Sequence, residues 1–323
     1  NMFSLSLYNS TLKSQWDNFI DESKNGTFLF KRDFIEYHNN RFDDHSFLFY
    51  KQDKLMAVFP ANKLNDRIYS HQGLTYGGLI LSEYTKFSDV FQILTLLLSH
   101  LHETNYSSLT LKEIPMIYKS LPSDEVNYLL YRMKAELIRR DILSVVKLGN
   151  NSYSRDRIQG RKRGEKFKLT IEESSSFKEF WSSILIPNLK NKHNVSPVHS
   201  LKEIIHLNNL FPKNIRQFNV YSNDKIVAGT TIFETKTTAH VQYISANTEK
   251  NKLGSLDYLF TYLIEEVFNT KDYFDFGNSN ENNGEFVNQG LLYWKEGFGA
   301  RSITQDFYEI KTKNYSMLKD LMI

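Results

Sequence analysis

The sequence contains no cysteine, which excludes a disulfide-stapled scaffold, a thiolate nucleophile and cysteine-ligated zinc. It also lacks a strong charge of either sign, because 40 lysine and arginine side chains are nearly balanced by 37 aspartate and glutamate side chains, for a net charge of +3. This balance argues against DNA as a partner. No two histidines lie four residues apart, and no histidine has carboxylates at ligand spacing. The sequence therefore predicts no metal site.

Long hydrophobic runs are absent as well. No segment reaches the roughly 18 apolar residues that a membrane-spanning helix needs, and residues 1–7 have neither a basic region nor a long apolar core. We therefore expect a cytoplasmic protein with no membrane span. The hydrophobic content of 41% over 323 residues is enough for one large core or for two of ordinary domain size.

The order of the predicted elements is repeated along the chain. Each half reads as a strand, two helices, a strand meander, a long helix, a strand, a short helix and a final strand, with the long helices at 86–103 and 253–268. The best linker is Gly149-Asn150-Asn151-Ser152. The simplest account is an internal duplication of an α/β (α+β) domain, with domains at 2–150 and 151–323, each a mostly antiparallel mixed sheet flanked by helices.

The stretch from Phe274 to Arg301 carries the strongest functional signal. It reads as a buried strand, an Asn-rich loop too polar for regular structure, and a short helix for which Asn288 is the expected N-cap. Near the end of that helix Lys295 follows Trp294. A cation beside an aromatic ring, facing a polar loop, is suited to bind an anion or a developing oxyanion. The alternative is an exposed lysine near a helix terminus.

A dense basic run follows the linker. Arg155, Arg157, Arg161 and Arg163 stand within nine residues, followed by further lysines up to Lys168. Guanidinium groups on one helix or loop could hold a phosphate or diphosphate. A solvated linker helix is the equally acceptable alternative.

Other candidate residues are scattered along the chain. His240 and Gln242 are two apart on a predicted strand and should share a face, with Tyr243 on the other. The base for an acyl transfer could be Asp275, Glu281, His240 or solvent. The remaining candidates are His71 and Tyr76 in the glycine-rich segment 70–78, Gly254 and Ser255 at the start of the second long helix, and Asn278 and Ser279 in the Asn-rich loop. Two capping boxes, Ser176 with Glu179 and Ser200 with Glu203, are expected to open helices.

These features resemble the FemABX-like branch of the GNAT acyltransferase superfamily. The resemblance rests on the segment SRDRIQGRKRGEKFKL, on the strand pair IVAGTTIFE and AHVQYISAN, and on FDFGNS followed by LLYWKEGFGAR. It implies two tandem GNAT-like domains, with Lys295 stabilising the acyl-transfer oxyanion and the helix near Gly254 receiving the pyrophosphate of a coenzyme A donor. The loop 251–256 has only one glycine, which is a poor match to a coenzyme A loop.

The resemblance implies an N-acyltransferase that uses acyl-CoA or aminoacyl-tRNA as donor. The acceptor would be an amine on a cell-wall precursor, a sugar nucleotide or a peptide, and the first domain would be degenerate and shape the substrate. Two alternatives stay open. One is a non-catalytic GNAT-like module that binds a nucleotide-linked ligand, and the other is a nucleic-acid-associated protein built on the basic run, against which the weak net charge argues.

Overall fold

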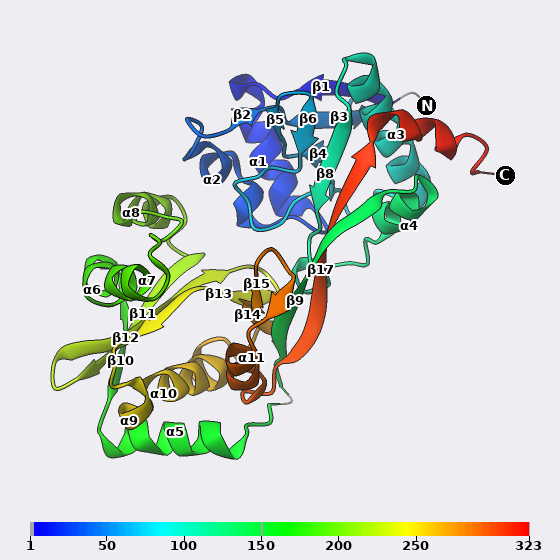
Figure 1. The fold of residues 1–323 in the computed structure, drawn as a ribbon. Helices are drawn as coiled ribbons and strands as arrows, with labels where there is room; N and C mark the ends of the chain where they lie inside the picture. The colour runs from blue at the N-terminus through cyan, green and yellow to red at the C-terminus, as the bar shows by residue number, and fades with distance from the viewer. Residues whose placement is uncertain (1–2, 150, 323) are drawn as a thin grey trace. The chain divides into compact units, whose positions relative to one another are not determined.

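Two compact units make up the fold in the computed structural model, which describes residues 3–149 and 151–322. The first unit contains residues 1–141 and 304–323, and the second contains 142–303. Two long strands, β9 (Glu136–Lys147) and β17 (Arg301–Lys311), each begin in one unit and end in the other (Figure 1).

The first unit has two sheets and one long helix. Its helices are α1 (Lys13–Glu22), α2 (Arg32–Glu36), α3 (Phe87–Glu103) and α4 (Glu125–Arg132), with short 3₁₀ segments at Ser10–Leu12, Phe28–Phe30, Met116–Tyr118 and Thr312–Leu318. Its strands are β1 (Phe3–Leu7), β2 (Asp43–Asp44), β3 (Phe47–Lys51), β4 (Lys54–Phe59), β5 (Asn62–Leu64), β6 (Arg67–Tyr69), β7 (Ile80–Leu81) and β8 (Ser108–Lys112). One sheet has the order β1-β3-β4-β7, and the other includes β17-β8-β6-β5-β2.

The core of the first unit forms around α3. Its apolar residues recur at helical spacing, so that Val90, Leu94, Leu97 and Leu101 bury one stripe of the helix against the sheets. The strands pair antiparallel except β6 and β8, which pair parallel. A parallel pair needs a crossover, and α3 supplies it.

The second unit has one large sheet with helices on both faces (Figure 1) and one small two-stranded sheet. Its helices are α5 (Arg155–Lys166), α6 (Lys178–Phe180), α7 (Ile186–His193), α8 (Leu201–Leu210), α9 (Lys250–Leu253), α10 (Ser255–Tyr262) and α11 (Gln289–Glu296), with π-helical turns at Trp181–Leu185 and Leu263–Val267. Its strands are β10 (Thr170–Ser174), β11 (Ile215–Ser222), β12 (Lys225–Glu234), β13 (Thr238–Ala246), β14 (Tyr273–Asn278), β15 (Asn280–Glu281) and β16 (Phe286–Val287). The sheet order is β10-β11-β12-β13-β14-β9, and only β13 and β14 pair parallel.

The duplication extends to local sequence. The β3–β4 hairpin reads YKQDKLMA and the β11–β12 hairpin reads YSNDKIVA, and both carry a register shift just before the tyrosine, at Tyr50 and Tyr221. The short helices α4 and α11 both contain Leu-Leu-Tyr. The predicted pair of mostly antiparallel mixed sheets flanked by helices is therefore confirmed, and each unit places its only parallel strand pair among the described residues next to a crossover helix.

The two units do not meet at a single boundary along the chain. The sequence predicted one boundary at 150, whereas the compact units divide after Asp141 and again before Thr304. The reason is strand pairing, because β9 pairs with β14 while β17 pairs with β8. The final strand of each repeat therefore joins the sheet of the other repeat. Asn150 of the predicted linker lies outside the described residues.

Most predicted elements are confirmed, with three local differences. The capping box at Ser200 and Glu203 forms, but that at Ser176 and Glu179 was wrong: α6 begins after Phe177, and Glu179 accepts a hydrogen bond from the Tyr221 hydroxyl. The second long helix is interrupted at Gly254, whose φ is +67°. Part of the Asn-rich loop forms the hairpin of β15 and β16.

Candidate active site

The candidate site lies where β13 and β14 stop pairing. The two strands are in parallel register from Thr238 opposite Tyr273 to His240 opposite Asp275. Beyond that point β13 continues to Ala246 without pairing to β14, and β14 reaches a register irregularity against β9 before Asn278. Two parallel strands that lose their pairing leave backbone and side chains free to line a ligand site.

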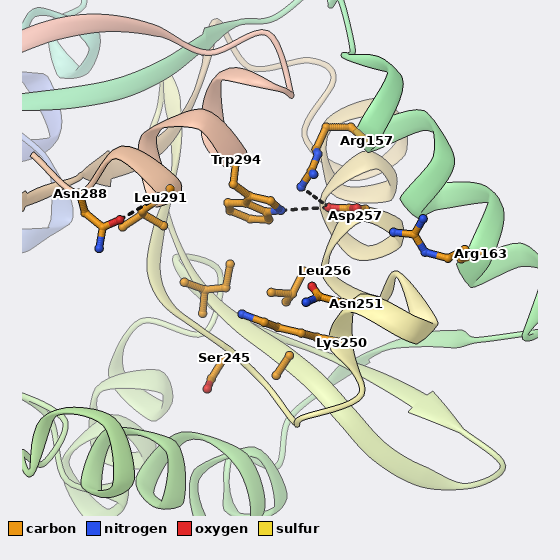
Figure 2. Close-up of a pocket in the computed structure, with 13 residues that line it drawn as sticks. Arg157, Arg163, Ser245, Lys250, Asn251, Leu256, Asp257, Asn288, Leu291 and Trp294 are labelled. Carbon is orange, nitrogen blue, oxygen red and sulfur yellow. Dashed lines mark hydrogen bonds and ion pairs between the residues drawn. The ribbon is translucent and has the colours of Figure 1, made fainter.

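A cavity of about 520 Å³ lies beside the unpaired part of β13. Figure 2 shows Trp294 on one side of it and Lys250, Asn251 and Leu256 on another. Its lining comes from five elements or their connections: Arg157, Arg163, Ile244, Ser245, Ala246, Lys250, Asn251, Leu256, Asp257, Asn288, Gly290, Leu291 and Trp294. Three cations, of which Arg157 is paired with Asp257, stand beside apolar, amide and hydroxyl groups in this lining. Such a lining suits a ligand that carries both phosphate and an apolar group.

The first turn of α10 reaches this cavity through Leu256 and Asp257, whereas Gly254 and Ser255 do not line it. Gly254 is its N-cap and makes no side-chain cap, and the Ser255 hydroxyl is buried with no partner among the described residues. Helix α5 packs close against it, since a Cβ on Gly254 would lie 2.0 Å from the carbonyl oxygen of Gly160. The uncapped amides and the helix dipole favour an anion there.

Asp257 ties three helices together at one edge of the cavity. Its Oδ1 accepts a hydrogen bond from Arg157 Nη1 at 2.7 Å and another from Trp294 Nε1 at 2.9 Å (Figure 2). Burial raises the pKa of Asp257, and Arg157 opposes that rise. The carboxylate can approach α5 this closely because residue 160 is glycine, where a Cβ would overlap it.

The two cavity arginines of α5 differ in what they bind. Arg157 is paired to Asp257, whereas Arg163 makes no ion pair with any of the residues 3–149 and 151–322. The Nε atoms of both arginines are buried without a hydrogen-bond partner among those residues. A buried guanidinium nitrogen without an acceptor costs free energy. An anionic ligand in the cavity would supply that acceptor.

Trp294 and Lys295 lie on different sides of α11. The indole of Trp294 packs edge-on against Phe260, Phe276 and Phe298, with ring centroids 4.9 to 5.6 Å apart, and lines the cavity. Lys295 is only 4% exposed and does not line the cavity. Its Nζ donates to the carbonyl oxygens of Asn278 at 2.6 Å and Gly277 at 3.3 Å. Burial lowers the pKa of Lys295 to about 8, against a smaller opposing effect of Asp275.

His240 and Asp275 form a hydrogen-bonded pair at the last position of the parallel register. His240 Nδ1 lies 2.9 Å from Asp275 Oδ2, and the other carboxylate oxygen accepts a hydrogen bond from the backbone N–H of Gly277 at 2.7 Å. Asp275 is buried and His240 is partly exposed. The backbone carbonyls that hold Lys295 therefore follow Asp275 by two and three residues along β14.

The other predicted residues of the second unit lie at the edges of this site or behind it. Gln242 is the residue that the register shift in β13 leaves unpaired, and its Oε1 is buried without a partner among the described residues. Tyr243 faces the opposite side, where its hydroxyl contacts His199. Ser279 is buried with an unpaired hydroxyl, and Glu281 is exposed and accepts a hydrogen bond from Asn288.

Of the predicted site residues, only Arg157, Arg163 and Trp294 line the cavity. Four of the others make their contacts elsewhere. Arg155 is exposed at the start of α5, and Arg161 pairs with Glu165 and with Glu265 and does not line the cavity. His71 and Tyr76 are buried in the first unit, where His71 stacks on His38. The hydroxyl of Tyr76 is hydrogen-bonded to that of Thr27. Both side chains contribute to packing there.

Sequence reasoning missed Asp257 and the loop residues Lys250 and Asn251 that line the cavity. The only signal for Asp257 was an acidic residue three positions after Gly254, which ordinarily indicates a helix cap. Here the carboxylate turns to α5 and α11 instead. Among residues 3–149 and 151–322 there is no group of three or more metal-ligating side chains and no helix both long and apolar enough to cross a membrane.

The architecture is that of tandem GNAT-like proteins. A crystal structure of FemX superposes with a TM-score of 0.69 at 10% identity, over 98% of this chain and 99% of that chain. The C-terminal domain of a putative lysylphosphatidylglycerol synthetase from Agrobacterium fabrum gives 0.57 at 11% identity over 97% and 96%. A tandem GNAT protein from the clavulanic acid biosynthesis pathway gives 0.50 at 8% identity over 96% and 99%.

No family profile and no curated protein sequence matches the chain. At 8 to 11% identity the structural likeness establishes the fold. The chain consists of two tandem GNAT-like units, as the sequence resemblance implied.

Proposed function

We propose that the protein is an acyltransferase that moves an acyl or aminoacyl group from an activated donor to an amine. The observation that carries the proposal is the 520 Å³ cavity at the unpaired end of β13 and β14, with Arg163, Lys250 and the first turn of α10 on its wall. The proteins named FemX and lysylphosphatidylglycerol synthetase, and the tandem GNAT protein, share this fold, which supports the same class of reaction.

The donor binds with a phosphate near the start of α10. Arg163 has a buried nitrogen without an acceptor, and a phosphate would satisfy it with a charge-assisted hydrogen bond. The apolar wall made by Ile244, Leu256 and Leu291 receives the acyl or aminoacyl portion. Acyl-CoA and aminoacyl-tRNA both present a phosphate and an acyl group, so both remain candidate donors, and the poor coenzyme A loop favours the second.

Lys295 acts on the tetrahedral intermediate. Its ammonium is fixed by two carbonyl oxygens and keeps one hydrogen with no acceptor among the described residues. A fixed cation in a buried site stabilises a developing oxyanion far more than one in water does. Because Lys295 is buried beside the cavity rather than on its wall, the donor carbonyl must reach it past Trp294. The acceptor is an amine on a cell-wall precursor, a sugar nucleotide or a peptide.

Donor binding is tested by thermal unfolding of the protein with acetyl-CoA, coenzyme A or charged tRNA, because a ligand that binds only the folded state raises the melting temperature. We expect at least one donor to stabilise the wild type. Arg163→Gln should weaken its binding about tenfold or more. Arg161→Gln is the matched control on the same helix, since that side chain pairs with Glu165 and Glu265, and it should bind as the wild type does.

Three results would count against the proposal or redirect it. If none of these donors stabilises the protein, or if Arg163→Gln binds as tightly as the wild type, the cavity is not the donor site. If a donor binds and no amine is acylated, the burial of Lys295 favours the second candidate, a non-catalytic module that binds a nucleotide-linked ligand.

A further inference from the structure

The reaction proposed above needs a group that removes a proton from the acceptor nitrogen, and the site contains one suitable pair. An amine that attacks a carbonyl becomes acidic as its nitrogen bonds to carbon, so a nearby base speeds the step. Lys295 is unsuited to this task while it serves as the oxyanion partner. Glu281 is exposed and already hydrogen-bonded to Asn288.

We infer that His240 is the general base and that Asp275 positions it, an inference that rests on the proposed acyl transfer. The parallel register places the two residues directly opposite one another at the last paired position. Asp275 Oδ2 lies 2.9 Å from His240 Nδ1. A carboxylate at that nitrogen holds its proton in place and leaves Nε2 with a free lone pair.

Asp275 cannot be the base itself. It is buried, one oxygen faces the imidazole and the other accepts the N–H of Gly277. Both oxygens are therefore engaged and oriented. His240 is 13% exposed, and its Nε2 makes no hydrogen bond with any of residues 3–149 and 151–322.

Gly277 lies next to both the imidazole of His240 and the ammonium of Lys295. Its φ of +71° is a left-handed conformation, in which its N–H reaches Asp275 while its carbonyl oxygen reaches Lys295. A Cβ at this position would lie 3.4 Å from Cε1 of His240, in contact with the ring. Glycine thus lets one residue link the base and the cation.

The step balances as follows. The amine nitrogen bonds to the acyl carbon, and His240 Nε2 takes the proton that the nitrogen sheds. The oxyanion forms beside Lys295 and then collapses, and the bond from the acyl carbon to the donor oxygen or sulfur breaks. The leaving atom takes the electron pair and receives the proton from the imidazolium, so that no oxidant and no reactant besides the donor and the amine is needed.

The test compares His240→Asn with the wild type in the full chain. Asparagine keeps an N–H donor near the position of Nδ1, so the contact with Asp275 persists while the base is lost. We expect donor binding, measured by thermal shift, to be unchanged and the transfer rate to fall about 100-fold. The acidic limb of the pH-rate profile should disappear, and added imidazole should restore part of the rate.

The charged groups near the ring are Asp275 on β14, which is hydrogen-bonded to it, and Lys295 on α11, which is held by the carbonyl oxygen of Gly277. Asp275→Asn should lower the rate and shift the ring tautomer, which ¹⁵N NMR of the histidine reports. His206→Asn is the matched control, because that histidine is exposed on α8, and its rate and pH profile should equal those of the wild type.

The outcomes separate the two proposals. If the wild type transfers acyl groups and His240→Asn keeps both rate and pH profile, the base assignment is wrong and the acyltransferase proposal stands. If His240→Asn loses rate but its pH profile is unchanged and imidazole has no effect, His240 has only a structural role. If the wild type acylates no amine with a donor that binds, the proposed function fails and the base assignment fails with it.

Discussion

The two units use the same residue type in the same place for opposite purposes. Asp89 and Asp257 are both the third residue of their crossover helix. In the first unit Asp89 accepts the N–H of Lys86 and closes the start of α3, with Lys51 as its ion pair. In the second, Asp257 turns to Arg157 and Trp294, and the start of α10 stays open.

In other places too, the first unit has a packed side chain where the second unit has a polar group of the candidate site. The Leu-Leu-Tyr segment that the two short helices share is followed by different residues. In the first unit Arg132 ends α4 and Met133 follows it, whereas in the second unit Trp294 and Lys295 continue α11. Met133 is fully buried in the apolar core, where Lys295 at the matching position holds two carbonyl oxygens. A cavity near α4 measures only about 40 Å³. The comparison indicates that a duplicated fold keeps its packing in one copy and opens a site in the other, and it supports a substrate-shaping role for the first unit as a proposal.

The largest expected effect is on the transfer rate, when Lys295 is replaced by methionine, the residue at the matching position of the first unit. Lys295→Met should lower the transfer rate about 100-fold or more, because the oxyanion loses its fixed cation, while removal of a buried charge leaves the fold intact. Steady-state turnover and thermal unfolding measure the two effects. Lys112→Met is the control: Lys112 is partly buried, in the first unit, where it donates to the carbonyl oxygen of Leu74. Equal loss of rate in both variants would contradict the comparison.

The next effect is on stability and concerns the contact between α5 and α10. Gly254→Ala should destabilise the protein by about 3 kcal/mol, since alanine resists the left-handed φ and its Cβ would overlap the Gly160 carbonyl oxygen. Urea unfolding measures the change. Gly290→Ala is the control, because its Cβ would meet nothing nearer than 3.7 Å in α11, and it should be neutral or slightly stabilising. A cost below about 1 kcal/mol for Gly254→Ala would show that α5 can move away.

A third prediction concerns pH, and it applies to one lysine in each unit. Burial lowers the pKa of both Lys112 and Lys295 to about 8 from the usual 10.5. Above pH 8 the unfolded chain binds more protons than the folded one, so the free energy of unfolding should rise between about pH 8 and 10.5, by at most about 3 kcal/mol for each lysine. Below pH 8 both states are protonated and the slope vanishes.

Activity should move in the opposite direction over the same range, because the ammonium of Lys295 is lost as pH rises through about 8. Urea unfolding and transfer rates at matched pH values measure the two trends. Lys295→Met should flatten part of the stability slope, and Lys112→Met should flatten another part without changing the alkaline fall in activity. A stability slope identical in wild type and both variants would contradict the buried-lysine explanation.

Periodicity and turn chemistry were enough to predict most of the fold. The apolar stripe of α3 and the N-cap at Asn288 are local patterns, and the structure confirms both. The exchange of β9 and β17 was not predictable, because it depends on pairing between residues far apart in sequence.

The same limit applies to the site. The sequence pointed to His240, Asp275 and Lys295 separately, but only the register of β13 with β14 and the left-handed Gly277 bring them together. The roles of Arg157 and Arg161 could not be separated from the basic run alone. Their partners, Asp257 and Glu265, lie about a hundred residues further along the chain.

The smallest expected effect distinguishes the two equivalent hairpin turns. Gln52 and Asn223 both adopt a left-handed φ, +56° and +49°, but asparagine tolerates this region better than glutamine does. Gln52→Gly should therefore stabilise the protein by about 0.5 kcal/mol, because relief of the backbone strain exceeds the entropy that glycine adds to the unfolded chain. Asn223→Gly should be neutral or slightly destabilising, since there is little strain to relieve. Both changes in stability are measured from the midpoints of urea unfolding, provided that the dependence of the unfolding free energy on urea concentration is unchanged. An equal gain in stability at the two turns would mean that the second hairpin is as strained as the first.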